Sequence, residues 1–138
     1  MNFPNGNAAS SSGTSRALRL LIVDDSNIMR RRIERSQQFE DLQVVGAAAN
    51  GVEALELFRQ HDPDLVTMDL TMPQMDGIEC IEKLVQLKLA VRILVVSALA
   101  DKATAVDAME KGANGFLNKP FTDRQLNDAL AELMRGSG

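Results

Sequence analysis

Residues 65–77 read Leu-Val-Thr-Met-Asp-Leu-Thr-Met-Pro-Gln-Met-Asp-Gly, and this stretch decides the fold. Its first part is a short apolar run rich in β-forming residues, with Asp-Pro-Asp before it and Pro and Gly after it. This pattern predicts a buried strand over residues 65–69. Open α/β sheets place their chemistry at the carboxyl ends of the strands. Asp69, which closes the strand, is therefore the first candidate functional residue.

A second apolar run, residues 18–23, ends in the acidic pair Asp24-Asp25. If the two strands are neighbours, Asp24, Asp25 and Asp69 converge at one edge of the sheet. Three carboxylates at such a place repel one another, and such a cluster usually persists because a cation or another positive group offsets their charge. Hard oxygen ligands beside an open loop suit Mg²⁺ that is completed by waters and a phosphate. The trio is thus a predicted magnesium site.

Apolar runs and amphipathic segments alternate along the chain. Predicted strands cover residues 18–23, 43–48, 65–69, 92–97 and 115–118, and predicted helices lie near 26–38, 51–60, 77–88, 102–111 and 123–134. Capping-box spacings at Asn50/Glu53, Asp76/Glu79 and Thr122/Gln125 support three of the helix starts. Five successive strand–helix units predict an α/β fold, a doubly wound parallel sheet with helices on both faces. We expect the first and last helices on one face and the other three on the opposite face.

Length and composition restrict the function further. The 138 residues suffice for one domain, and the formal charge of −4 argues against generic nucleic-acid binding. A single cysteine, Cys80, fits a reducing cytoplasm, and no apolar run approaches membrane-spanning length. Residues 1–16 are rich in Asn, Ser and Gly and are predicted to form a disordered tail. We expect a folded domain at 17–135 and a flexible end at 136–138.

Ser97 ends the fourth predicted strand, and Lys119 follows the fifth. A hydroxyl and an ammonium at the acidic edge of the sheet can both contact phosphoryl oxygens, whose charge needs neutralising. A lone serine or lysine would more often be a cap or a solvated charge. Their common placement at the same sheet edge favours a role in phosphoryl chemistry.

Four motifs in this order resemble the CheY-like receiver domain of two-component response regulators. They are Val23-Asp24-Asp25-Ser26, the stretch from Met68 to Gly77, Ser97-Ala98, and Gly112-Ala113-Asn114-Gly115-Phe116-Leu117-Asn118-Lys119-Pro120-Phe121. The resemblance covers residues 18–134. It implies a flavodoxin-like (βα)5 fold with a five-stranded parallel sheet of strand order 2-1-3-4-5.

The resemblance also implies a role for each site residue. Asp69 would accept a phosphoryl group; Asp25, Asp69 and the Thr71 backbone carbonyl would bind Mg²⁺, with Asp24 acting through water. Lys119 and Ser97 would contact the phosphoryl oxygens, and Lys119-Pro120 would be a cis peptide. Ser97 and Phe116 would form the switch, read out on the face made by helix 102–111, strand 115–118 and helix 123–134. Thr71 and Leu99 would flank the path of attacking water, and apolar Leu99 predicts that self-dephosphorylation is not especially fast.

The implied function is that of a single-domain signalling switch rather than an enzyme. Its expected partners are a sensor histidine kinase or a histidine phosphotransfer protein, and a downstream protein effector. No nucleic acid or membrane is expected to bind directly, and the chain would be cytoplasmic and monomeric or weakly dimeric. A receiver fragment of a larger regulator whose output domain is missing fits the same residues.

Two other classes of protein remain as alternatives. A magnesium-dependent phosphohydrolase of the haloacid-dehalogenase type would need a second Asp where Thr71 stands, and a chain long enough for a cap. A flavodoxin-like cofactor binder would need a Gly/Ser/Thr-rich loop where Asp24-Asp25-Ser26 stands. The arginines at 30, 31, 32 and 35 are interpreted as a solvated helix face, and Cys80 as a packing residue.

Overall fold

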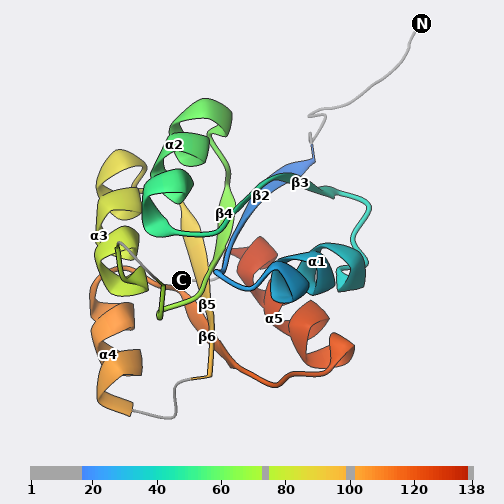
Figure 1. Cartoon of the computed structure of the whole chain (residues 1–138). Helices are drawn as coiled ribbons and strands as arrows, with labels where there is room; N and C mark the ends of the chain where they lie inside the picture. Colours follow the sequence, from blue (N-terminus) through green and yellow to red (C-terminus); the bar gives the residue numbers. More distant parts are fainter. Residues whose placement is uncertain (1–16, 73–74, 99–101, 137–138) are drawn as a thin grey trace, which may run out of the picture.

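The computed structural model describes residues 17–72, 75–98 and 102–136, and within them five strands and five helices alternate (Figure 1). The strands are β2 (Leu18–Val23), β3 (Leu42–Ala48), β4 (Leu65–Met68), β5 (Arg92–Ser97) and β6 (Gly115–Asn118). The helices are α1 (Asn27–Ser36), α2 (Gly51–His61), α3 (Gly77–Leu87), α4 (Lys102–Glu110) and α5 (Asp123–Arg135). The predicted tail 1–16 and Leu99 lie outside the described residues.

The five strands form one parallel sheet in the order β3-β2-β4-β5-β6. Counted along the chain this is 2-1-3-4-5, so the predicted flavodoxin-like topology is confirmed. Val23 pairs with Met68, and therefore the acidic residues that follow β2 and β4 leave the sheet side by side. The Asp69 amide donates to the Val23 carbonyl at 2.9 Å, which keeps the two strand ends together.

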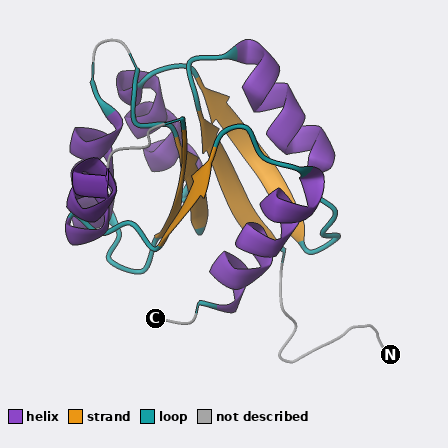
Figure 2. Ribbon diagram, turned by 90° about the horizontal axis from the view of Figure 1, so that it is seen from below, coloured by secondary structure: helices purple, strands orange, loops and turns teal. Residues whose placement is uncertain are grey.

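Alternate residues of each strand face opposite sides of the sheet and build two apolar layers. The core on one side joins Val66, Met68 and Val95 to the buried faces of α2, α3 and α4. The core on the other side joins Ile22, Leu65 and Leu94 to α1 and α5 (Figures 1 and 2). The predicted distribution of the helices over the two faces is confirmed.

Side-chain caps begin α2, α3 and α5, the three helices for which the spacings predict them. Asn50, Asp76 and Thr122 each accept from the backbone N–H three residues later, at the starts of α2, α3 and α5. Only Thr122 and Gln125 form the complete reciprocal capping box. Element bounds differ from the predicted ones by no more than two residues at each end. None of the described helices is long and apolar enough to cross a membrane.

Helix α4 carries its larger apolar side chains, Val106 and Met109, on the surface. Their exposed fractions are 50% and 44%, whereas Ala108 is fully buried. The small Ala108 side chain is the α4 residue in the core beneath α2, α3 and α4. The larger apolar side chains of α4 are consequently left on the surface. Gly112, just after the helix, has a positive φ of +123°, which suits a glycine at a helix C-terminus, and a Cβ there would lie 2.6 Å from Val85 Cγ2.

Candidate functional site

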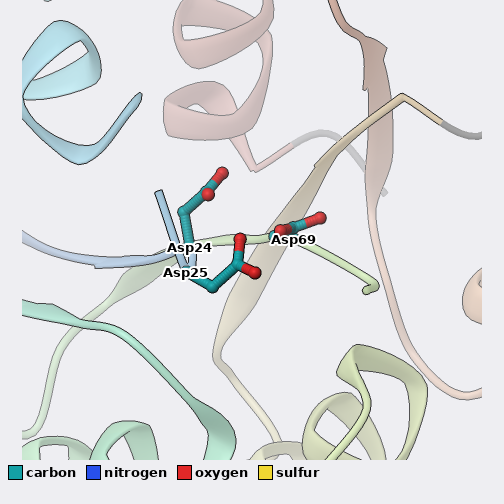
Figure 3. A group of neighbouring side chains, drawn as sticks. All are labelled: Asp24, Asp25 and Asp69. Atoms are coloured by element: carbon teal, nitrogen blue, oxygen red, sulfur yellow. The ribbon is translucent and has the colours of Figure 1, made fainter. Parts of the chain in front are cut away.

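Three carboxylates gather where β2 and β4 end (Figure 3). Asp24, Asp25 and Asp69 each present an oxygen, and these oxygens all lie within 4.8 Å of one another. Asp24 and Asp69 are 1% and 3% exposed, whereas Asp25 is open to solvent. The predicted acidic cluster therefore exists, with two members buried and one at the entrance.

The start of α1 holds Asp24 in place. The Ser26 amide donates to Asp24 Oδ1 at 2.9 Å, and the Ser26 side chain caps α1 by accepting from the Met29 amide. Arg30 Nη1 donates to the Asp24 backbone carbonyl at 2.7 Å. The first turn of α1 thus fixes both the main chain and the carboxylate of Asp24.

The loop after β4 holds Asp69 in a similar way. The Thr71 amide and hydroxyl lie 3.3 and 3.5 Å from Asp69 Oδ1 and donate to it. The Gly77 amide donates to the Leu70 carbonyl at 3.0 Å, which brings the start of α3 against this loop. A Cβ at position 77 would lie 2.3 Å from the Asp69 carbonyl oxygen. The Asp-Gly at 76–77 therefore caps α3 and permits a close approach that no larger residue allows.

Lys119 supplies a positive charge to the cluster. Its ammonium lies 2.7 Å from Asp24 Oδ2 and 3.9 Å from Asp69 Oδ2, with the side chain 18% exposed. Its amide donates to the Ser97 carbonyl at 2.9 Å, which ties the end of β6 to that of β5. The Lys119–Pro120 peptide is cis, as the resemblance implied. One ammonium faces three carboxylates, so the site retains a negative charge.

This residual charge is visible in the acidity of Asp69. The pKa of Asp69 is raised from 3.8 to about 6, mainly by burial, then by the neighbouring Asp24 charge and more weakly by Asp25. The Lys119 ammonium and the Thr71 amide act in the opposite direction. The carboxylate is thus destabilised unless additional positive charge enters the site.

Ser97 is the last residue of β5, which neighbours the strand that Asp69 follows, and Phe116 lies on the next strand, β6. Ser97 is 1% exposed, and its hydroxyl has no hydrogen-bond partner within the described part of the chain. A buried hydroxyl in this state costs about 1–3 kcal/mol, which an incoming polar group would recover. Phe116 is half-buried and packs against the core beneath α2, α3 and α4. Hard oxygen donors, one ammonium and an unsatisfied hydroxyl together fit a divalent cation with a phosphoryl group.

The fold and this site define a receiver domain. Residues 20–131 match the response regulator receiver domain family, and the chain belongs to that family. It is a CheY-like receiver, and proteins of this kind act as signalling switches in two-component systems rather than as classical enzymes. This membership favours the receiver over the phosphohydrolase and cofactor-binding alternatives.

Similar proteins come from several bacteria. The chemotaxis protein CheY of Bacillus subtilis is 40% identical over 114 residues, covering 83% of this chain and 95% of that protein. The protein-glutamate methylesterase/protein-glutamine glutaminase of Pseudoalteromonas atlantica is 46% identical over 123 residues, covering 85% of this chain but 32% of that protein. The solved CheX–CheY–BeF3–Mg complex of Borrelia burgdorferi gives a TM-score of 0.82 at 30% identity, over 88% of this chain and 92% of that chain.

Several supporting residues escaped the sequence reasoning. Ser26 and Gly77 carry recognisable signals, namely a cap before a helix and a glycine after a capping Asp. The interpretation of the α1 arginines as a solvated face is wrong for Arg30 and Arg32. Both donate to backbone carbonyls of the loops around the site. No local pattern reveals such contacts, because their partners are set by tertiary structure.

Gly77→Ala is expected to weaken the fold and the site together. The added Cβ must push the start of α3 away from the Asp69 carbonyl, at a cost of about 1–3 kcal/mol in unfolding free energy. Urea unfolding and calorimetric titration with Mg²⁺ measure the two effects. Gly46→Ala is the control, because the nearest neighbours of its Cβ are side-chain atoms of Leu21 at 3.3 Å and of Leu57 at 3.5 Å, and no backbone atom. Equal stability and Mg²⁺ affinity in the two variants would contradict the steric argument.

Asp69→Asn is expected to stabilise the metal-free protein in a pH-dependent way. Because the pKa of Asp69 in the folded protein, about 6, lies above its ordinary value of 3.8, ionisation of this carboxyl opposes folding. The cost is absent below about pH 4, grows as the pH rises, and reaches about 3 kcal/mol above about pH 7. Urea unfolding of both proteins in a chelator across this range measures the difference. A difference that does not change with pH would show that the carboxylate is not destabilised.

Proposed function

We propose that this receiver accepts a phosphoryl group on Asp69 and thereby switches its binding to another protein. The observation that carries the proposal is the buried Asp69 carboxylate at the end of β4, with Asp24, Asp25 and Lys119 around it. The donor is a sensor histidine kinase or a histidine phosphotransfer protein. The chain works as a single-domain, CheY-like regulator, cytoplasmic and monomeric or weakly dimeric.

Asp24, Asp25, Asp69 and the Thr71 backbone carbonyl are the residues that would hold Mg²⁺. When bound, the ion neutralises charge on the transferring phosphoryl group and orients it. The chain prepares this site in advance, since Asp24 is held by Ser26 and Arg30, and Asp69 by Thr71. The entrance position of Asp25 leaves the cluster accessible from solvent.

The transfer itself forms a bond between an Asp69 carboxylate oxygen and phosphorus while the bond from phosphorus to the donor nitrogen breaks. The donor histidine leaves with its electron pair, and Asp69 becomes an acyl phosphate. Lys119 stabilises the charge on the phosphoryl oxygens, because its ammonium already lies 3.9 Å from Asp69 Oδ2. The Ser97 hydroxyl, unsatisfied in this state, donates to another phosphoryl oxygen.

The switch follows from the contact with Ser97. When this hydroxyl turns toward the phosphoryl group, the space it leaves lets Phe116 rotate inward on the adjacent strand. Ser97 pairs with Asn118 and Val95 with Phe116, so the two switch residues lie on neighbouring strands within two residues of register. The effector reads the change on the face formed by α4, β6 and α5. The exposed Val106 and Met109 of α4 supply apolar area for that contact.

Incubation with acetyl phosphate and Mg²⁺ is expected to add one phosphoryl group to each molecule, as measured by intact mass. The adduct should be absent from Asp69→Asn and strongly reduced when a chelator removes the metal. Asp128→Asn, which alters a well-exposed carboxylate on α5, is the control and should be labelled like the wild type. Multiple turnover on phosphate esters, without a stoichiometric adduct, would overturn the proposal.

A second expectation concerns the lifetime of the phosphorylated state. Leu99 cannot orient an attacking water by hydrogen bonding, so Leu99→Glu and Thr71→Asn are expected to speed the loss of phosphate relative to the wild type. A phosphate-release time course after removal of the donor measures the rates. Equal rates of phosphate release in the three proteins would contradict the assignment of these two positions to the path of the attacking water.

A further inference from the structure

Arg32, in the middle of α1, binds the loop that carries Lys119 at three points. Its guanidinium lies 4.3 Å from the centroid of the Phe121 ring, and its Nη2 donates to the Phe121 carbonyl at 2.5 Å. The same nitrogen lies 3.3 Å from Asp123 Oδ1. The Arg32 side chain thus contacts the ring and the carbonyl of Phe121 and the first residue of α5, Asp123. We call the segment that holds these contacts, residues 119–123, the Lys119 loop.

The three contacts of Arg32 differ in how much they stabilise the loop. The pair with Asp123 is partly exposed, with side chains 33% and 62% accessible, and such pairs contribute little. The carbonyl bond and the ring contact matter more, because Phe121 is 5% exposed and anchored in the core beneath α1 and α5. Arginine suits this place, since its planar fork can stack on a ring and donate to a carbonyl at the same time. Arg32 therefore fixes Phe121 both by its ring and by its main chain.

The position of this loop determines where Lys119 points. β2 and β6 are separated in the sheet by β4 and β5. The Lys119 side chain, which follows β6, nevertheless reaches the Asp24 carboxylate, which follows β2. Arg32 links the same two parts of the chain a second time, because it extends from the helix that follows Asp24 to the loop that follows Lys119.

We propose that Arg32 is a positioning residue for phosphoryl transfer, acting through Lys119. It holds the loop 119–123 against α1 so that the Lys119 ammonium stays directed at the acidic cluster. Arg30 holds the Asp24 side of the same cluster, so α1 sets the separation of the two partners of the Asp24–Lys119 pair. This role rests on the proposed phosphoacceptor function.

Two neighbouring residues provide matched controls. Arg31 precedes Arg32 on α1 and is exposed, and no contact to the loop 119–123 is seen for it among the described residues. Asn127 also joins α1 to α5, since its Nδ2 donates to the Ser36 carbonyl and its Oδ1 accepts from the Gln38 amide. Its Nδ2 also donates to the Asp123 carbonyl at the start of α5. Asn127→Ala therefore disturbs the packing of the two helices but removes no contact of Lys119 or Phe121, which separates a structural effect from a positioning effect.

The test combines Arg32→Met with Lys119→Met in a double-mutant cycle. The rates of labelling by acetyl phosphate at saturating Mg²⁺, and the dissociation constants for beryllofluoride, are measured for the four proteins. Arg32→Met is expected to slow labelling and weaken beryllofluoride binding by roughly tenfold when Lys119 is present, and to have no further effect when it is absent. Arg32→Lys, which keeps the charge but not the fork, should fall between the wild type and Arg32→Met. Arg31→Met and Asn127→Ala should label like the wild type.

A measurement on the metal-free protein supplements the kinetics. Hydrogen exchange of the amides at 119, 121 and 122 should be faster in Arg32→Met and unchanged in Arg31→Met. Arg32→Met and Asn127→Ala both lower the unfolding free energy if both are structural links, but only the former changes exchange in this loop and the Lys119-dependent rate. This difference distinguishes positioning from general stabilisation.

Two results would overturn the inference. One is a labelling rate for Arg32→Met equal to that of the wild type, and the other is a reduction of the same factor with and without Lys119. Failure of the proposed function has a different signature, because the wild-type protein itself would then take no phosphoryl group from acetyl phosphate. If Arg32→Met does not fold, the same double-mutant cycle is measured with Arg32→Lys in its place.

Discussion

The repulsion among three carboxylates at one sheet edge is the constraint on which the rest of the site depends. Asp24 and Asp69 are withdrawn from water, and Asp25 lies at the entrance beside them. Lys119 brings one compensating charge, and it lies closer to Asp24 than to Asp69. The protein therefore carries a local electrostatic cost in the metal-free state, which appears as a raised pKa of Asp69. Such a site gains free energy from any cation and phosphoryl group that it binds.

The surrounding structure serves to keep this strained arrangement in place. Backbone amides of the first turn of α1 and of the loop after β4 donate to the carboxylates, so that the oxygens cannot move apart to relieve the repulsion. The close contact at Gly77 holds the β4–α3 loop against the strand end. On the opposite side, Arg32 and the amide of Lys119 fix the loop after β6. Rigid positioning is what makes the charge of the site useful for phosphoryl transfer.

Much of the fold and of the acidic cluster could be predicted from short stretches of sequence. The apolar runs that end in acid predicted strand ends and a shared acidic cluster, because parallel strands bring their carboxyl ends to one edge of the sheet. The capping spacings at 50, 76 and 122 placed three helix starts correctly. Other features were not accessible in this way. The burial of α4 through Ala108 rather than Val106 depends on how closely that helix approaches the core, which its own periodicity does not contain.

The sequence by itself thus determined the order of the elements, the faces on which the helices lie and the set of acidic, hydroxyl and lysine residues at the sheet edge. These features depend on local preferences, on the alternation of polar and apolar residues, and on the few connections that parallel strands permit. Only the tertiary structure decided which partners the charged groups choose. Lys119 pairs with Asp24 across two intervening strands, and Arg30 and Arg32 bind carbonyls of different loops although they are two residues apart on one helix. Such contacts depend on distances between segments far apart in the chain, and those distances are set when the whole core packs.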